Sequence, residues 1–296
     1  MKAFLPTLIV VAGPTASGKT DFAIELAQSL DTEIISADSR QIYKELSIGT
    51  AKPSPEKLQQ VKHHFIDHCS IFDEYTAGMF ESEVITLLTT LFLTKKTVIM
   101  AGGTGLYIKA VCSGLDKLPK ADPQLRAQLQ QELNEYGVDF LFNKLQKLDL
   151  EGSSFLDPKN PLRIMRALEI VTSSGKKLSE LKNESFPQKR PFNIIKVMMD
   201  IERPLLYQRI NERTLQMMQD GFEAEARIMH KYKHLNALNT VGYKELFEYF
   251  DGNTTINEAI EKIQQHTRNY AKRQLTWFRN DTDFISHKEF NLKDLV

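Results

Sequence analysis

The chain has 296 residues, 42% of them hydrophobic, which is enough for one large domain or two modest ones with a substantial core. Lysine plus arginine equals aspartate plus glutamate at 38 each, so any nucleic acid must be held by a local basic surface and not by bulk charge. The two cysteines, Cys69 and Cys112, form no C-x-x-C pair, which argues against a zinc finger or disulfide scaffold, and no apolar run approaches membrane-spanning length.

The first predicted element is a strand, the apolar run Leu8–Ala12. It starts so close to Met1 that it leaves no room for a signal or transit peptide, and we expect a cytoplasmic, monomeric protein. The pattern G-x-x-x-x-G-K-[ST] follows at once, and an amphipathic helix comes after it. The residues of this phosphate loop are Gly13, Pro14, Thr15, Ala16, Ser17, Gly18, Lys19 and Thr20. Loop amides, the helix dipole and the lysine together predict a site for a diphosphate, without saying whether a nucleotide carries it.

The second predicted strand, Glu33–Ala37, ends at Asp38. We expect this strand to neighbour the phosphate loop, because ligands bind at the carboxyl edge of open parallel sheets. A carboxylate there could hold magnesium or accept a proton, and the alternative is a cap on a turn. Three histidines, at 63, 64 and 68, lie around the strand-like Phe65–Asp67, and we interpret them as structural and not as a metal cluster.

The third predicted strand, Thr97–Ala101, follows a helix at about 77–93 that carries a wide apolar stripe. Alternation of strands and helices predicts a parallel sheet. The strand runs into the segment Gly102–Gly105, whose glycines would permit close approach of the backbone to a ligand. We therefore predict an α/β fold, a parallel-sheet core like that of P-loop NTPases, flanked by helices.

From Asp122 to about Lys182 the pattern becomes helical, and strand character returns at Phe192–Asp200. This predicts an all-helical insertion domain at residues 119–186, within a core domain made of residues 1–118 and 187–296. Within the insertion, Asn160 and Pro161 begin a helix, as a cap followed by a first-turn proline.

The last third is helical, and its most informative residue is Arg213. On a helix over 203–220 it lies in the apolar stripe of Leu206, Ile210 and Met217, with Arg209 one turn earlier. A buried guanidinium needs an anion, either an acidic side chain or a bound diphosphate. A terminal helix at about 255–279 is expected to have one stripe of apolar and aromatic residues and another of basic ones. The apolar stripe is Ile256, Ile260, Ile263, Tyr270 and Trp277, and the basic one is Arg268, Lys272 and Arg279.

Eight strings, in order along nearly the whole chain, together resemble the tRNA dimethylallyltransferase (tRNA isopentenyltransferase) family. They are Gly13–Thr20, Ser36–Tyr43, Gly49–Pro53, His63–Asp67, Gly102–Tyr107, Asp157–Glu169, Val241–Tyr243 and Thr267–Arg279. The chain stops after the core region without the zinc-finger extension of eukaryotic relatives, so it resembles the bacterial form. The resemblance implies transfer of a dimethylallyl group from dimethylallyl diphosphate to the N6 amine of adenosine 37 in the anticodon stem-loop of tRNA, assisted by Mg²⁺.

Carried over by position, Asp38 resembles the general base, Thr20 the hydroxyl on the magnesium side, and Arg213 an arginine that binds the diphosphate together with Lys19 and the rest of the phosphate loop. The resemblance also implies contacts with tRNA. These fall on Asp38, Ser39, Arg40, Gln41, Thr104, Arg126, Leu162, Arg163, Ile164, Met165, Arg166, Asn239, Thr240, Val241, Gly242, Tyr243 and Lys244. The string at 239–244 departs from the more common pattern at its start, which puts the contact of Asn239 in question.

Two other functions fit some of the same residues. A kinase for a small metabolite would share the loop, the sheet and the acid after the second strand, but the third strand leads to glycines where a second metal-binding carboxylate would be expected. A non-catalytic RNA-binding protein is disfavoured because Lys19, Thr20, Asp38 and Arg213 are all present.

Overall fold

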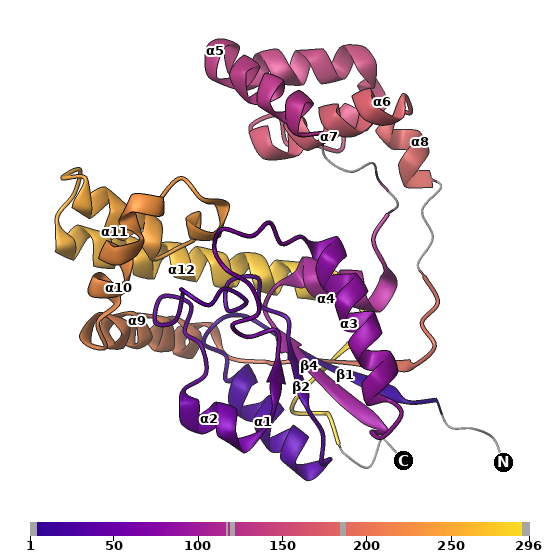
Figure 1. The fold of residues 1–296 in the computed structure, drawn as a ribbon, viewed down its shortest axis with the longest axis vertical. Helices are drawn as coiled ribbons and strands as arrows, with labels where there is room; N and C mark the ends of the chain where they lie inside the picture. Colours follow the sequence, from indigo (N-terminus) through magenta and orange to yellow (C-terminus); the bar gives the residue numbers. More distant parts are fainter. Residues whose placement is uncertain (1–4, 117, 119–121, 184–187, 292–296) are drawn as a thin grey trace. The chain divides into compact units, whose positions relative to one another are not determined.

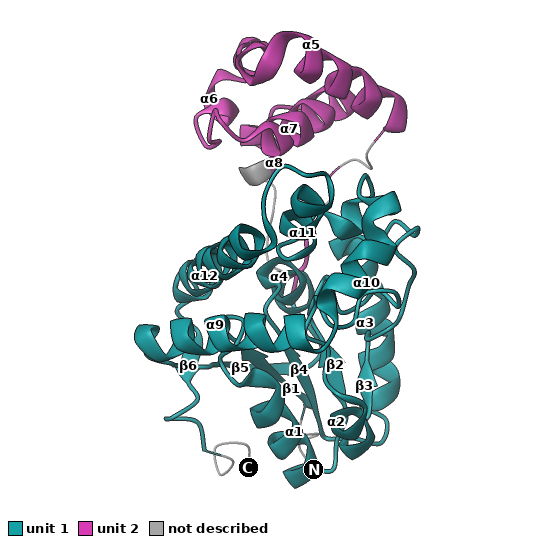
Figure 2. Ribbon diagram, turned by 90° about the vertical axis from the view of Figure 1, so that its left-hand side faces the viewer, with its two compact units in different colours: residues 1–113, 189–296 teal, residues 114–188 magenta. Residues whose placement is uncertain are grey.

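The computed structural model describes all residues except 1–4, 117, 119–121, 184–187 and 292–296. The chain divides into two compact units, one made of residues 1–113 and 189–296 and the other of residues 114–188 (Figure 2). Of the domain boundaries predicted from the sequence, the one between 186 and 187 lies outside the described residues, and the one between 118 and 119 lies at their edge.

The first unit is built on a six-stranded, parallel sheet with the order β3-β2-β4-β1-β5-β6. The strands are β1 (Thr7–Ala12), β2 (Ile34–Ser36), β3 (His63–His64), β4 (Thr97–Gly102), β5 (Asn193–Met198) and β6 (Phe284–Ser286). The parallel sheet confirms the predicted fold class. We expected β2 to neighbour the phosphate loop: β4 lies between β2 and β1 in the sheet, but Asp38 after β2 and the phosphate loop line the same cavity. Two strands that follow each other in sequence pair in the sheet only if the connection between them places them side by side. The sequence of one strand does not indicate its neighbours in the sheet.

Helices cover both faces of this sheet (Figure 1). The helices of the unit are α1 (Lys19–Ser29), α2 (Pro55–Gln60), α3 (Ala77–Leu91), α4 (Gly105–Ser113), α9 (Arg203–Gln219), α10 (Phe222–Met229), α11 (Tyr243–Phe250) and α12 (Ile256–Arg279), with short 3₁₀ turns at His230–Tyr232 and Asn236–Leu238. Along β1, Ile9 and Val11 pack toward α1, while Leu8 and Val10 join the larger cluster of α3, α4 and the C-terminal helices. A strand that is buried on both faces has a continuous run of apolar residues, and β1 is an example.

The buried face of α12 is rotated from the predicted stripe. Its buried residues are Ala259, Ile263, Ala271, Gln274 and Phe278, whereas Trp277 is 44% exposed. Of the residues in the predicted stripe, Ile263 is buried as expected, whereas Trp277 is exposed and its neighbour Phe278 is buried instead.

The second unit is helical, as the sequence pattern indicated. It contains α5 (Pro123–Leu148), α6 (Leu150–Ser153), α7 (Pro161–Ser174) and α8 (Leu178–Asn183). Helix α5 is kinked at Gly137, whose φ of 81° a residue with a Cβ rarely adopts. The Asn160 side chain accepts a hydrogen bond from Arg163 N, which is the predicted cap of α7. Its core includes Leu129, Leu141 and Leu168.

Both cysteines are buried, and burial raises the pKa of the Cys69 thiol to about 11 and that of Cys112 to about 12. Thiols with such pKa values are poor nucleophiles at neutral pH. None of the helices in the described ranges is both long enough and apolar enough to cross a bilayer.

Candidate active site

The phosphate loop (Gly13–Thr20) connects β1 to α1 and is shaped for an anion. Gly13 and Gly18 have φ values of 150° and 90°, and Ala16 is also left-handed at 63°. The hydroxyl of Ser17 is buried, and among the described residues it has no hydrogen-bond partner. Since buried polar atoms are almost always paired in native proteins, this hydroxyl is a candidate donor to a ligand oxygen.

Two cations converge on this loop, from the loop itself and from α9. Lys19 Nζ donates to Pro14 O at 2.6 Å, and Arg213 Nη2 donates to Thr15 Oγ1 at 2.6 Å. Burial lowers the pKa of Lys19 to about 8, although the negative charge of Asp38 raises it, and burial also lowers the pKa of Arg213. Within the described parts of the chain neither side chain forms an ion pair with a carboxylate. The charge of Asp38 nevertheless raises the pKa of Arg213 against the effect of burial, so both partners expected for Arg213, an acid and an anionic ligand, stay open.

Asp38 follows β2 and is held in a fixed orientation. Its Oδ1 accepts hydrogen bonds from the backbone N–H groups of Arg40, at 2.9 Å, and Gln41, at 3.3 Å. The next residue is fixed from β4, because Ser39 N donates to Thr104 Oγ1 at 3.0 Å. No hydrogen bond in the described structure occupies Oδ2 of Asp38. The carboxylate thus caps a turn with one oxygen, which is one of the two alternatives weighed for it, and its other oxygen leaves the functional role open as a prediction.

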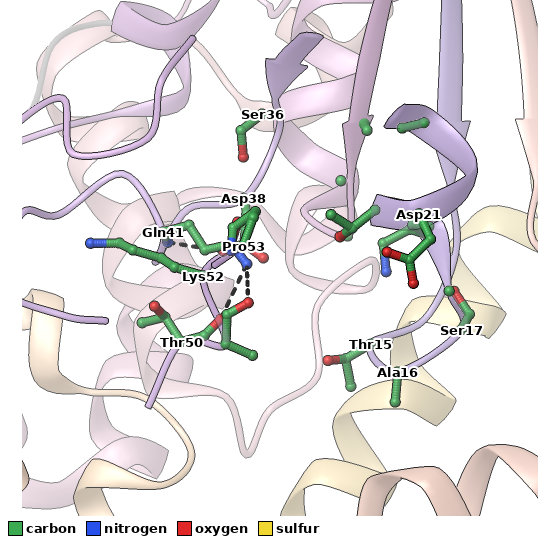
Figure 3. A pocket seen from close by; sticks show the side chains of 18 of the residues that line it. Thr15, Ala16, Ser17, Asp21, Ser36, Asp38, Gln41, Thr50, Lys52 and Pro53 are labelled. Atoms are coloured by element: carbon green, nitrogen blue, oxygen red, sulfur yellow. Dashed lines mark hydrogen bonds between the residues drawn. The ribbon is translucent and has the colours of Figure 1, made fainter. Parts of the chain in front are cut away.

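Two cavities of about 360 Å³ each meet at Asp38. The first contains the phosphate loop with Lys19 and Thr20, and the second opens toward the segment Asn239–Lys244. The lining residues that they share are Thr15, Asp38, Thr50, Ala51, Arg213 and Tyr270. Figure 3 shows Thr15, Ala16 and Ser17 on one side of the first cavity and Asp38, Gln41 and Thr50 on the other. This arrangement can hold an anionic group and a second reactant on either side of one carboxylate.

Many of the residues assigned to RNA from the sequence gather around the second cavity. Its lining includes Asp38, Ser39, Arg40, Asn239, Thr240, Val241, Gly242 and Lys244, and Gln41 lines the first cavity. The Arg40 guanidinium donates to the carbonyl oxygens of Asn236, Ala237 and Asn239 at 3.0 to 3.3 Å, which joins the two predicted strings. Tyr243 is different, because its side chain is fully buried.

The predicted residues of the helical unit form a separate group. Arg126 and Arg166 both bind the buried carboxylate of Glu169, at 2.7 and 3.0 Å. Ile164 and Met165 lie in the core of the unit, whereas Leu162 and Arg163 are exposed. The surface that the predicted residues of the helical unit expose therefore consists of Leu162, Arg163 and the outer parts of Arg126 and Arg166.

Comparison with known proteins decides the family. The model of the family described as IPP transferase matches residues 41–281. The chain belongs to this family.

Individual relatives agree with the assignment. A tRNA dimethylallyltransferase of Christiangramia forsetii is 49% identical over 93% of this chain and 91% of its own length, and one of Cytophaga hutchinsonii is 47% identical over 93% and 90%. The crystal structure of a tRNA isopentenylpyrophosphate transferase from Bacillus halodurans is 34% identical with a TM-score of 0.68, covering 98% of this chain and 92% of that one. A eukaryotic dimethylallyltransferase acting on tRNA is 26% identical with a TM-score of 0.80, covering 98% and 77%.

In this member of the IPP transferase family, Gln274 of α12 is a site residue that the sequence analysis did not single out. It is 6% exposed, its Oε1 accepts from Thr15 N at 2.9 Å, and its Nε2 donates to Gly103 O at 2.8 Å. A Cβ on Gly103 would lie 2.2 Å from Nε2 of Gln274. Gly103 thus makes room for a protein side chain, and the close approach of a ligand expected there stays a prediction. Gln274 stood within a quoted string, but nothing local distinguished it from its polar neighbours.

Tyr270, one turn before Gln274, was assigned to an apolar stripe but lines both cavities. Burial, and after it the charge of Asp38, raise the pKa of its hydroxyl to about 12. The phenol therefore stays protonated at neutral pH and can donate a hydrogen bond inside the site.

The three histidines each have a protein partner of their own. His63 bonds to Val61 O, His64 to Glu33 and His68 to Glu83, at 2.6 to 2.8 Å. Across the described residues, no three side chains of His, Cys, Asp or Glu are grouped so that they could hold a metal ion.

Proposed function

We propose that this chain transfers a dimethylallyl group from dimethylallyl diphosphate to the N6 amine of adenosine 37 of tRNA and releases diphosphate. The observation that carries the proposal is the meeting of an anion-binding cavity and a second cavity at the carboxylate of Asp38. The prenyl transfer to tRNA named for the relatives supports it.

The first cavity would bind the diphosphate of the donor. Loop amides, the Ser17 hydroxyl, Lys19 and Arg213 supply hydrogen-bond donors and positive charge where negative charge develops as the leaving group departs. Their low exposure strengthens these interactions relative to water. Prenyl transfer breaks the C–O bond and keeps the P–O–P bond of the diphosphate intact. The site therefore needs no second set of groups to assist cleavage between two phosphates.

A magnesium ion fits the oxygen donors at this cavity. Mg²⁺ takes hard oxygen ligands and commonly uses one or two from protein, with phosphate oxygens and water completing its shell. Thr20 Oγ1 is an oxygen of this kind, and Thr20 lines the first cavity. We assign Thr20 as the protein ligand on the diphosphate side. The ion, when bound, would neutralise charge on the leaving group.

The second cavity would receive the adenine. An adenine within a stacked loop cannot reach an enclosed carboxylate, so the base must turn out of its stack. Asp38 Oδ2 would accept a hydrogen bond from the N6 amine, and Asn239–Lys244 with Arg40 would contact the flanking RNA. With equal numbers of acidic and basic residues, the affinity for RNA must come from such local groups, together with the exposed arginine surface of the helical unit.

The chemical step is a substitution at the allylic carbon. The N6 lone pair forms the new N–C bond while the C–O bond to diphosphate breaks, and its electron pair leaves on the diphosphate oxygen. Asp38 removes the N6 proton, so that the product amine is neutral. We further propose that the protein acts as a monomer in the cytoplasm.

The proposal is tested by incubating the protein with unmodified tRNA, dimethylallyl diphosphate and Mg²⁺, digesting the RNA, and analysing the nucleosides by chromatography and mass spectrometry. We expect one adenosine per tRNA to gain the mass of a dimethylallyl group, at position 37. Unmodified RNA together with hydrolysis of ATP or transfer of its phosphate to a metabolite would instead establish the kinase.

A further inference from the structure

The segment Ser47–Pro53, here named the wall loop, lies between the two cavities. Thr50 and Ala51 line both of them. Ala51 has a φ of 50°, a left-handed conformation that residues other than glycine adopt infrequently. Such a conformation persists only where surrounding contacts hold it. The proposed reaction assigns no role to the string Gly49–Pro53. Its position between the two cavities indicates a role in separating the two substrates.

One end of the wall loop is fixed by side chains near Asp38. Gln41 Nε2 donates to Thr50 O at 3.2 Å and to Ala51 O at 3.1 Å. Lys52 Nζ donates to Tyr43 O and to Asp67, and its side chain is almost completely buried. The carbonyl groups of Thr50 and Ala51 in the wall loop are therefore held in place by Gln41, which follows β2.

The other end is fixed by a single carboxylate, Glu225 of α10. Its two oxygens accept hydrogen bonds from three successive backbone N–H groups, those of Ser47, Ile48 and Gly49, at 2.8 to 3.1 Å. They also accept one from the hydroxyl of Tyr243 at 2.5 Å. Consecutive N–H groups that point to one place form an anion site, which a full negative charge fills better than a neutral group.

Tyr243 connects this carboxylate to the segment Asn239–Lys244. Asn239 to Gly242 line the second cavity, while the ring of Tyr243 is fully buried. The rings around Gly49 leave no free space, because a Cβ there would lie 2.2 Å from Phe222 and 2.6 Å from Tyr243. A displacement of 239–244 cannot be absorbed at this contact and must move the wall loop as well.

We propose that Glu225 is a positioning residue for the transfer reaction. It joins the wall loop to the segment 239–244, so that the wall loop keeps a fixed position between donor and acceptor when both substrates are bound. This rests on the proposed function for the identity of the substrates. Glu225 lines neither cavity, so it acts on the alignment of the reactants and not on their binding.

The test compares Glu225→Gln with Glu223→Gln, a matched change on the same helix at a residue that pairs with Arg227 at the surface. The glutamine keeps the shape of the side chain but turns its NH₂ group toward at least one of the three backbone donors. We expect the single-turnover rate with both substrates saturating to fall at least about tenfold, while the KM values for donor and RNA change less than about threefold. Glu223→Gln should match the wild type.

Tyr243→Phe provides the second variant, and it also serves if Glu225→Gln does not fold. We expect a smaller fall in the same rate, and no additional fall when the change is combined with Glu225→Gln, because the hydroxyl acts through that carboxylate. A rate equal to wild type at temperatures where the variants are fully folded would overturn the proposal. So would full additivity of the two changes.

Hydrogen exchange separates this inference from the proposed function, because it needs no catalysis. In Glu225→Gln we expect faster amide exchange both in 47–51 and in 239–244, and no change in Glu223→Gln. Faster exchange in 47–51 alone would disprove the connection, whatever reaction the wild type catalyses. Absence of prenylated product with the wild-type protein would refute the function and leave the exchange result to decide the connection.

Discussion

Replacement of Arg213 by methionine separates a ligand-binding arginine from a structural one. Methionine has similar length and no charge, so it removes the donor to Thr15 Oγ1 while filling most of the space. Burial lowers the pKa of the guanidinium, which means that the folded protein without ligand disfavours the charge. A charge that costs stability without ligand is one that the ligand must stabilise.

The magnitude follows from the hydrogen bonds that a diphosphate would lose. Hydrogen bonds to charged groups contribute about 1.5–3 kcal/mol each, so the loss of one or two corresponds to about 3 kcal/mol. At about 1.4 kcal/mol per factor of ten, kcat/KM for the prenyl diphosphate should fall roughly 100-fold. The melting temperature of the ligand-free protein should stay the same or rise, since the substitution removes a desolvated charge.

The assay measures kcat/KM for the donor at saturating tRNA, the Kd for tRNA, and thermal unfolding without ligand. Arg203→Met is the control, because Arg203 lies on the same helix, is exposed, and lines neither cavity. We expect the control to match the wild type in all three measurements. Unchanged donor kinetics in Arg213→Met, or a melting temperature lowered by several degrees, would refute the assignment of Arg213 to the donor.

Three further predictions concern the same site. Asp38→Asn should reduce the single-turnover rate by about 10²- to 10⁴-fold with little change in the Kd for tRNA, as quench-flow and filter binding would show, and an unchanged rate would remove Asp38 as the base. Because burial lowers the pKa of Lys19 to about 8, kcat/KM for the donor should fall as pH rises through about 8. The free energy of unfolding of the ligand-free protein should change in the opposite direction: it should rise between pH 8 and pH 10.5, and this contribution is lost again as pH falls through 8. Lys19→Arg should abolish both trends, as pH-rate profiles and unfolding measurements would show. Gln274→Met leaves Thr15 N and Gly103 O unpaired and should lower the free energy of unfolding by about 2–4 kcal/mol, measured by denaturant titration, and weaken donor use more than RNA binding.

The parts of the site that the sequence predicted are those whose geometry is local. The phosphate loop requires only a strand, a glycine-rich turn and a helix start within eight residues. Arg213 was found because a helix converts spacing along the chain into position on one face, and one helix contains both the arginine and its apolar neighbours. The same rule was less successful on α12, where the predicted stripe included Trp277, which is exposed, and not Phe278, which is buried.

The parts that the sequence did not predict depend on contacts between distant segments. Glu225 bonds to Gly49 across 176 residues of sequence, and Gln274 bonds to Thr15 across 259. Neither residue has a local pattern that sets it apart from other polar side chains on its helix. Their roles follow from the order of the strands and the packing of α10 and α12, which is also why the position of β4 between β2 and β1 was missed.

The phosphate loop by itself cannot specify a reaction, because any diphosphate satisfies its amides and its lysine. The reaction is specified by what faces the loop, and here that is a second cavity of equal size with a fixed carboxylate at the junction. A phosphate-transferring site must hold the acceptor near the terminal phosphorus. A prenyl-transferring site must instead hold it near the carbon beyond the diphosphate, so the base belongs between the two cavities and not at the metal. Asp38 lines both cavities and has one oxygen fixed by backbone N–H groups, so under the proposed function it would meet that requirement.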